Sequence, residues 1–368
     1  MPENFRRTHR TVGYALNVFP YRTLAELRAC LAGDVLKVKA DAFPGGTFPI
    51  ELRLSENLLP ELQTDRDTLA DVKRFLDANQ LALVTINAFV MPAFHGEQVK
   101  ERVYLPGWHE SDARVQFTNA CLDVLAVLAP QDAALVSVSV PFGALKPVTM
   151  AAVAPNILRC AEHAASLGRR CVVALEPEPG LCVETTDEVV EFFERFVPDK
   201  LRAHLGVNFD LSHQLVEFED LAASVSSLQR HDVPIAKVHV SNAAEMTSLQ
   251  PFYDDSIYLH QVCGVDDSGR RIYFSLDWPK TPPPAGIRRF RVHYHLPVFP
   301  SSLSSTLPEV ERFLTSILPT IHSSTPAVIE TYTWPEQNRN MAQLPGNIVR
   351  ELNWVREKIF LSESARQI

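Results

Sequence analysis

The sequence predicts a (β/α)8 barrel, because short apolar runs rich in β-branched residues alternate with amphipathic, helix-like segments along the 368-residue chain. Eight such runs occur, and eight strands alternating with helices fit a closed parallel barrel better than an open sheet. The glycine fingerprint of dinucleotide-binding folds and the Walker A loop are both absent. A phosphate-cradling open sheet is therefore not indicated.

The expected strands share a high content of Val, Ile, Leu and Ala and end at turn-forming or polar residues. In chain order they are Val12–Phe19, Ile50–Leu54, Leu81–Asn87, Ala134–Val140, Cys171–Glu176, Ala203–Phe209, Ile235–Val240 and Ala327–Thr331. The clearest amphipathic segments between them are Asp65–Ala78, Ser111–Leu128, Thr149–Ser166 and Glu188–Phe196.

Two connections are too long to be simple loops, at about 89–110 and 241–289. The second contains the stretch PKTPPPAG, which cannot be regular structure, and is followed by a ninth β-like run, Phe290–Leu296. Loops that follow barrel strands gather at the C-terminal face, so both insertions are expected to cover a substrate site. We expect residues 1–361 to form a single barrel domain and residues 362–368 a tail.

Composition restricts the partners. Acidic residues outnumber basic ones by 44 to 35, a net charge of −9, which disfavours nucleic acid as a ligand. Apolar runs fall far short of the roughly 18 residues that span a bilayer, and no secretory signal is evident, so we expect a cytoplasmic protein without membrane insertion. The six cysteines form no CxxC pair, so no thiolate metal site is indicated. The oligomeric state stays open.

Acidic and histidine side chains recur where the late strands end. They are Glu176, Glu178, Asp210, His213, His239, His293, His295 and Glu330. In a barrel these positions converge on one mouth, where crowded carboxylates and imidazoles need a cation to compensate for desolvation and repulsion. The set is a mixed oxygen and nitrogen ligand field that suits one or more divalent ions, Mn²⁺, Fe²⁺, Co²⁺, Zn²⁺ or Mg²⁺.

The same positions carry a resemblance to a known family. The segments LEPEPG, FDLSH, KVHVS, YLHQV, VHYHLPVF and ETYTW resemble the EboE-like "metabolite traffic protein" family of ebo gene clusters, within the xylose-isomerase-like TIM-barrel superfamily. Phe209 and His239 depart from that family's pattern, which tends to have Cys and Gln there. The histidine at 239 brings the chain closer to the general metal-binding pattern of the superfamily.

The resemblance to sugar epimerases implies that Glu176, Asp210, His239 and Glu330 hold one divalent cation. Glu176 and Glu330 would then be catalytic, one removing a proton and the other returning it across a metal-bound enediolate. The implied substrate is a small sugar, sugar phosphate or cyclitol-like metabolite of a secondary-metabolite pathway. His213 would bind a substrate hydroxyl. By similarity to endonuclease IV, His213, His293 and His295 could instead complete a second metal site.

Weaker substrate-binding candidates are the strand-end residue Asn87, Glu178 after Pro177, and three residues of the first insertion, namely His95, Lys100 and Trp108. Three other functions remain open at this point. One is a multinuclear-iron oxidative enzyme that uses His293 and His295, and another is a zinc phosphoesterase on the same barrel. The third is a carrier that binds its metabolite without turnover.

Overall fold

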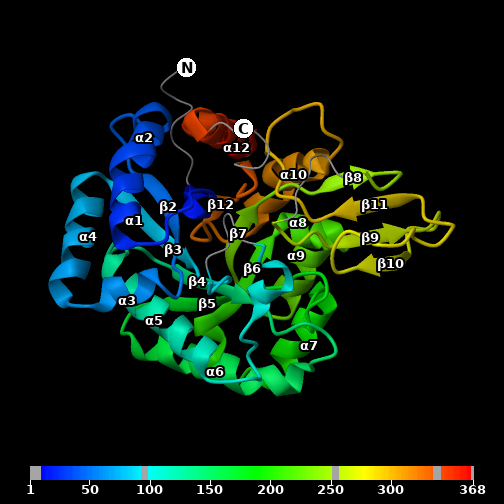
Figure 1. Cartoon of the computed structure of the whole chain (residues 1–368), viewed down its shortest axis with the longest axis horizontal. Coiled ribbons are helices and arrows are strands. Elements are labelled where there is room, and N and C mark those ends of the chain that lie inside the picture. The colour runs from blue at the N-terminus through cyan, green and yellow to red at the C-terminus, as the bar shows by residue number, and fades with distance from the viewer. Residues whose placement is uncertain (1–9, 93–97, 251–256, 335–340, 366–368) are drawn as a thin grey trace.

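The computed structural model describes residues 10–92, 98–250, 257–334 and 341–365, and at its centre eight parallel strands close into a barrel (Figure 1). Around the barrel the strands are adjacent in the order β1-β12-β7-β6-β5-β4-β3-β2. Their bounds are β1 (Val12–Ala15), β2 (Phe48–Arg53), β3 (Leu81–Asn87), β4 (Val136–Pro141), β5 (Cys171–Glu176), β6 (Leu205–Asp210), β7 (Ile235–Val240) and β12 (Ala327–Ile329). The predicted (β/α)8 fold is confirmed.

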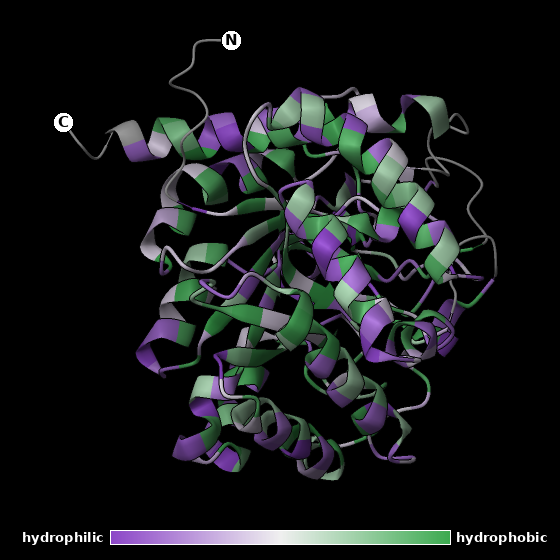
Figure 2. Cartoon of the chain, turned by 90° about the vertical axis from the view of Figure 1, so that its left-hand side faces the viewer, coloured by the Kyte–Doolittle hydropathy of each residue, from purple (hydrophilic) through white to green (hydrophobic). Residues whose placement is uncertain are grey.

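Helices surround this barrel. They are α1 (Leu24–Cys30), α2 (Leu36–Ala42), α3 (Leu58–Gln63), α4 (Arg66–Ala78), α5 (Ala113–Leu128), α6 (Met150–Ser166), α7 (Thr186–Phe196), α8 (Leu211–Val216), α9 (Leu221–Arg230), α10 (Leu307–Arg312) and α12 (Leu344–Ala365). Hydrophobic residues gather on the strands and the inner helix faces, while hydrophilic residues lie on the outer faces (Figure 2). No helix in the described ranges is long and apolar enough to cross a membrane.

Several element ends differ from the sequence prediction, each for a local reason. The first strand stops at Ala15, where a 3-10 turn over Leu16–Val18 begins. Helix α7 starts before Glu188 because the Thr185 side chain accepts from the backbone of Glu188 and the Glu188 carboxylate accepts from the backbone of Thr185. Helix α12 continues to Ala365, so residues 362–365 are helical where the sequence predicted a tail.

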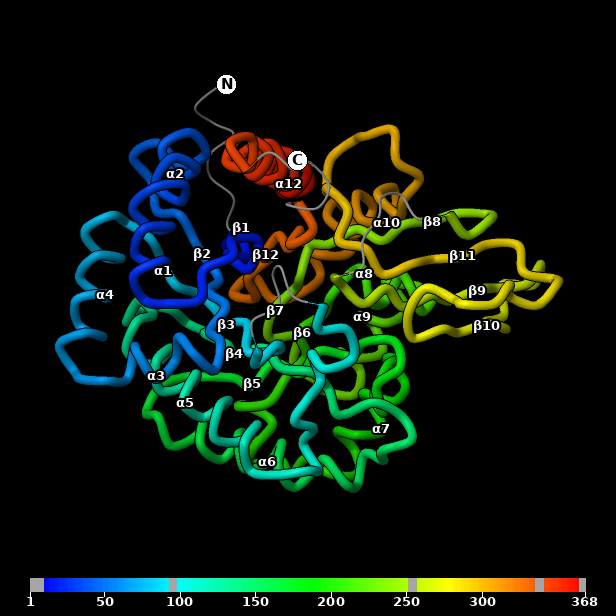
Figure 3. The backbone as a smooth tube through the Cα atoms, in the orientation of Figure 1, coloured from blue at the N-terminus to red at the C-terminus, as the bar shows by residue number. Residues whose placement is uncertain are grey.

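The second insertion forms a four-stranded antiparallel sheet of its own, in the order β10-β9-β11-β8. Its strands are β8 (Ala244–Met246), β9 (Val262–Val265), β10 (Arg271–Ser275) and β11 (Arg289–Val292). The sheet projects from the side of the barrel beyond β7 (Figure 3). The expected ninth run ends as a strand at Val292, so the two histidines that follow lie in an irregular segment and not on a strand face.

Candidate metal centre

Four side chains converge where β5, β6, β7 and β12 end. Glu176 and Asp210 are the last residues of their strands, His239 lies on β7, and Glu330 directly follows β12. One ligand atom of each lies within 4.8 Å of all the others, and all four residues are buried. The Nδ1 atom of His239 is 3.4 Å from Glu176 Oε1, 3.5 Å from Asp210 Oδ2 and 3.1 Å from Glu330 Oε2. The four residues that the resemblance implied as metal ligands therefore lie together.

Two carboxylate oxygens of this cluster receive no hydrogen bond from the part of the chain that the structure describes. Glu176 Oε2 and Asp210 Oδ2 are buried and have no hydrogen-bond partner among the described residues. Burial opposes ionisation of Glu330, but the neighbouring His239 and His295 outweigh it and lower the pKa of this carboxyl to about 2. Unpaired buried carboxylate oxygens are costly unless a cation meets them. Three carboxylates and one imidazole fit a divalent metal ion.

The two oxygens of Asp210 have separate tasks. Oδ1 accepts from the backbone N–H of His213 at 3.0 Å, which caps helix α8, and from the Ser241 hydroxyl at 2.7 Å. Oδ2 is the oxygen that faces His239 without a donor. The cap fixes the carboxylate so that its free oxygen points into the cluster.

A buried charge pair orients the imidazole of His239. Its Nε2 atom lies 3.1 Å from Glu51 Oε1, and Glu51 also accepts from the ammonium of Lys237, which donates to Ser139 Oγ at 2.8 Å. A carboxylate at Nε2 keeps a proton on that nitrogen, and the side-chain amide of Asn208 lies 3.0 Å from Nδ1. Burial lowers the pKa of His239, but the carboxylates of Glu330, Glu51 and Glu176 outweigh it and raise that pKa well above its usual value. Nδ1 faces the three carboxylates of the cluster, so a metal ion bound there would take the place of its proton.

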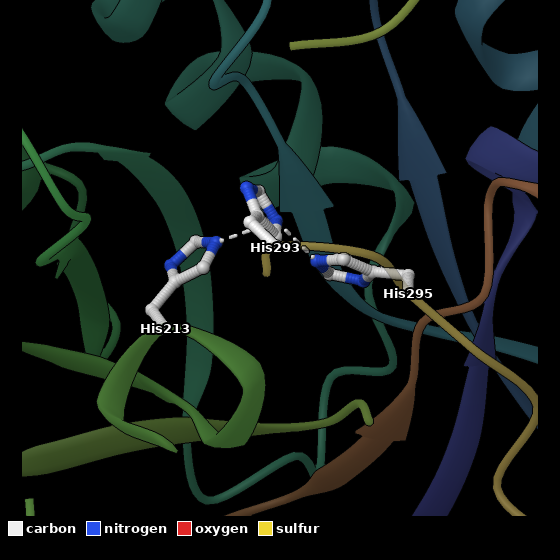
Figure 4. A group of neighbouring side chains, drawn as sticks. All are labelled: His213, His293 and His295. Atoms are coloured by element: carbon white, nitrogen blue, oxygen red, sulfur yellow. Dashed lines mark hydrogen bonds between the residues drawn. The ribbon is translucent and has the colours of Figure 1, made fainter. Parts of the chain in front are cut away.

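A second cluster consists of three histidines beside the first (Figure 4). His213 lies in the first turn of α8, while His293 and His295 follow β11. The Nε2 atom of His293 is 3.2 Å from Nε2 of His213 and 2.9 Å from Nε2 of His295. The structure thus brings together the three residues that the sequence offered for a second metal or for substrate.

The opposite nitrogen of each of these rings faces an acceptor. Nδ1 of His213 lies 3.0 Å from the Pro177 carbonyl oxygen, and Nδ1 of His295 lies 2.9 Å from the Glu330 carbonyl oxygen. Nδ1 of His293 lies 2.7 Å from the side-chain oxygen of Gln261. Each Nδ1 is therefore placed to donate to its acceptor, and the three Nε2 atoms converge.

The amide of Gln261 is itself held in one orientation. Its Nε2 donates to Glu178 Oε1 and to the hydroxyl oxygen of Tyr104, each at 2.7 Å, which leaves its oxygen for His293. Burial, followed by the positive neighbours His213 and His295, holds the pKa of His293 well below its usual range. A neutral ring with a converging lone pair is suited to bind a metal ion such as Zn²⁺, Fe²⁺ or Co²⁺.

Both clusters open into one pocket of about 660 Å³. Asn87, a weaker candidate from the sequence, lines this pocket and donates to Glu330 Oε1 at 3.1 Å. Asn17, which sequence reasoning missed, donates to the same oxygen at 2.6 Å. Glu178 also lines the pocket, and burial raises its pKa to about 7.

Lys100 and Trp108, two candidates from the first insertion, lie elsewhere. Lys100 does not line the pocket, because its ammonium donates to the Tyr258 carbonyl at 2.6 Å and pairs with Asp277 at 2.9 Å. Trp108 is fully buried in the core, where its indole N–H donates to the Pro141 carbonyl at 3.0 Å. His95 lies outside the described residues.

Comparison with known proteins agrees with the barrel. A family model described as "Xylose isomerase-like TIM barrel" matches residues 49–268. No curated protein matches the chain in sequence.

Three solved structures that share the fold are only distantly related in sequence. A xylose isomerase-like TIM barrel protein from Mycobacterium smegmatis, in complex with magnesium, has 12% identity and a TM-score of 0.56, with 96% of this chain and 97% of that chain covered. D-psicose 3-epimerase with D-tagatose, from Clostridium cellulolyticum H10, has 13% identity and a TM-score of 0.54, covering 95% and 99%. The IOLI protein with a bound zinc atom has 13% identity and a TM-score of 0.53, covering 95% and 99%.

Proposed function

The chain belongs to the xylose isomerase-like TIM barrel family, and from that premise we propose that it is a divalent-metal-dependent isomerase or epimerase that acts on a small polyhydroxylated metabolite. The observation that carries the proposal is a pair of buried carboxylate oxygens without a hydrogen-bond partner in the described ranges, Glu176 Oε2 and Asp210 Oδ2, in the cluster that His239 and Glu330 complete. Relatives in fold that are described with magnesium, with zinc and as a D-psicose 3-epimerase support it.

In this proposal Glu176, Asp210, His239 and Glu330 hold the ion. When bound, the ion would polarise the oxygen atoms of the substrate and so acidify the neighbouring C–H bond. Glu176 and Glu330 are the two groups that move the proton, one as base and the other as acid. Asn17 and Asn87 keep Glu330 in place, because both amides donate to its Oε1.

The same motifs that resemble the EboE-like family contribute to the pocket, which supports a secondary metabolite as the substrate. LEPEPG contains Glu176 and Glu178, and YLHQV contains Tyr258 and Leu259, which all line the pocket. ETYTW contains Glu330 and Tyr332, which also line it. The residues behind the resemblance are therefore those that would contact a ligand.

The three converging Nε2 atoms favour a second candidate function. If His213, His293 and His295 also bind a metal ion, the site becomes multinuclear. That arrangement suits a multinuclear-iron oxidative enzyme or a zinc phosphoesterase.

Metal content separates the candidates. We would measure metal by inductively coupled plasma mass spectrometry on protein purified without a metal-binding tag, as wild type, Asp210→Asn and His293→Ala. Asn at 210 keeps an oxygen for the helix cap and removes the charge, so metal loss in that variant reports on ligation.

One divalent ion per chain, lost in Asp210→Asn and kept in His293→Ala, is the result expected for the isomerase. Two or more irons or zincs, reduced in both variants, would move the assignment to multinuclear chemistry. A protein that holds no metal after loading with any of the candidate ions would overturn both and leave a carrier.

A further inference from the structure

The pocket has two unlike halves. We call its polar lining the floor, which consists of Asn17, Arg53, Asn87, Glu176, Glu178, His213, His293, His295 and Glu330. The wall is the part of the lining that the two insertions contribute. The side chains that the first insertion gives to the pocket are apolar or aromatic: Phe89, Val90, Val99, Val103 and Tyr104. Those from the second insertion share this character: Ile257, Tyr258 and Leu259.

The side chains of this wall pack against one another. Phe89 and Tyr104 meet edge to face with ring centroids 5.8 Å apart, in one hydrophobic cluster with Leu259. Val99 and Tyr258 form a second cluster, and the Tyr258 ring lies 5.1 Å from that of Tyr332. Aromatic contacts of this kind hold the apolar faces in place.

Polar contacts also join the two insertions to one another. Lys100 joins them through the Tyr258 carbonyl and Asp277, and the Gln261 amide reaches the Tyr104 hydroxyl. Lys100, a substrate-binding candidate from the sequence, therefore joins the two insertions instead. The hydroxyl of Tyr104 is likewise engaged, so its ring presents apolar surface to the pocket.

A bare sugar gains little from the aliphatic part of this wall, because each hydroxyl placed against Val99, Val103 or Leu259 would lose its hydrogen bonds to water. Hydrocarbon would gain from the same contact. We infer that the substrate joins a small oxygen-bearing head, seated at the carboxylate and histidine floor, to an apolar body of aliphatic or aryl character that lies against the insertion wall. The inference rests on the proposed function for the placement of the head.

A matched pair of chelators tests it. Acetohydroxamate and octanohydroxamate share a metal-chelating head and differ by six methylene groups, so they report separately on floor and wall. Titration calorimetry on Zn²⁺-loaded protein should show octanohydroxamate binding at least about 100-fold more tightly, since each buried methylene is worth about fourfold in affinity. Val103→Asn should remove most of this gain and leave acetohydroxamate binding unchanged.

The control carries the same substitution on the surface. Val127 is 45% exposed on helix α5, and Val127→Asn should keep the full chain-length gain. Equal affinity of the two hydroxamates for the wild type would overturn the apolar wall as a binding surface while leaving the metal centre intact. If neither acetohydroxamate nor octanohydroxamate binds the Zn²⁺-loaded wild type, the proposed metal centre is wrong and this inference falls with it.

Discussion

The Nε2 atom of His239, on β7, lies 3.1 Å from Oε1 of Glu51, on β2. The Glu51 carboxylate therefore orients the imidazole ring whose other nitrogen faces the three carboxylates of the candidate metal centre. Both side chains are completely buried. The Glu51 charge is balanced by Lys237, also completely buried, so the barrel interior contains an ion pair directly behind the candidate metal centre. A carboxylate behind a metal-binding histidine fixes its tautomer and raises its basicity.

Glu51→Gln should therefore weaken divalent-metal binding by about 10- to 100-fold. The amide can no longer offer a charged acceptor to Nε2–H, so Nδ1 becomes a poorer ligand. Competition with a fluorescent zinc chelator would measure the change in dissociation constant.

The same substitution leaves the Lys237 ammonium buried without its partner, which should destabilise the metal-free fold by about 3–5 kcal/mol. The double variant Glu51→Gln/Lys237→Met serves as the control, because it removes the orphaned charge. It should recover most of the unfolding free energy in urea titrations but not the metal affinity. Full recovery of both would show that Glu51 acts only as a counter-charge.

The multinuclear candidate function requires a second metal site at the three histidines, which cobalt substitution would reveal separately from the carboxylate site. A second equivalent of Co²⁺ is expected to add visible absorption that is missing in His293→Ala and retained in Asp210→Asn, because the two ligand sets share no residue. Absorption bands that disappear in both variants would instead indicate one centre shared by the two clusters.

Strand-end chemistry could be predicted from the sequence because it depends on one-dimensional information. Apolar runs mark the strands, and a polar residue that ends each run must lie at the barrel mouth. Asp210 and Glu330 were found in this way. Glu51 and Lys237 were missed because each lies within an apolar run, and their pairing joins residues 186 positions apart. A charged residue inside a barrel strand was the available signal.

The insertions were harder to predict for a related reason. Lys100 and Trp108 were expected near a ligand because basic and aromatic residues of a mouth loop often bind one. Residue type does not determine the direction in which a side chain points. Lys100 instead meets a carbonyl 158 positions away, and Trp108 fills the core. Gln261, a neutral amide in the second insertion, belongs to the YLHQV segment behind the resemblance but was not singled out, although it orients His293.

Under the multinuclear candidate function, Gln261→Leu should weaken metal binding at the three-histidine site by about 10-fold or more while sparing the carboxylate site. Leucine removes the acceptor for Nδ1–H of His293 and the amide donor to Glu178, so the ring loses its fixed tautomer. Two-site titration with Zn²⁺ would measure both constants. Gln229→Leu, a matched change at an exposed helix residue, should alter neither constant. A selective loss at the carboxylate site would contradict this role for Gln261.

Glu351, on α12, is expected to make the free energy of unfolding depend on pH, and this prediction does not involve metal binding. It accepts hydrogen bonds from the Tyr14 hydroxyl at 2.6 Å, the Thr331 hydroxyl at 2.7 Å, the Trp334 indole at 2.9 Å and the Val298 backbone at 3.1 Å. Glu351→Gln replaces one acceptor oxygen by an NH₂ group that faces donors. We therefore expect a loss of about 1–3 kcal/mol in the free energy of unfolding.

The sign of the pH dependence follows from burial, which raises the pKa of Glu351 against the opposing effect of the donors from Tyr14, Trp334 and Thr331. The unfolded chain releases this proton near pH 4.3, whereas the native chain keeps it to higher pH. The contribution of Glu351 to the free energy of unfolding is therefore complete below about pH 4.3, and it falls as the pH rises through the pKa of Glu351 in the native protein. Because glutamine does not titrate, the advantage of wild type over Glu351→Gln should be larger at pH 4.5 than at pH 7.5 in urea titrations. Exposed Glu56, changed to Gln, should show no such trend, and an advantage that grows with pH would mean that the four donors outweigh burial.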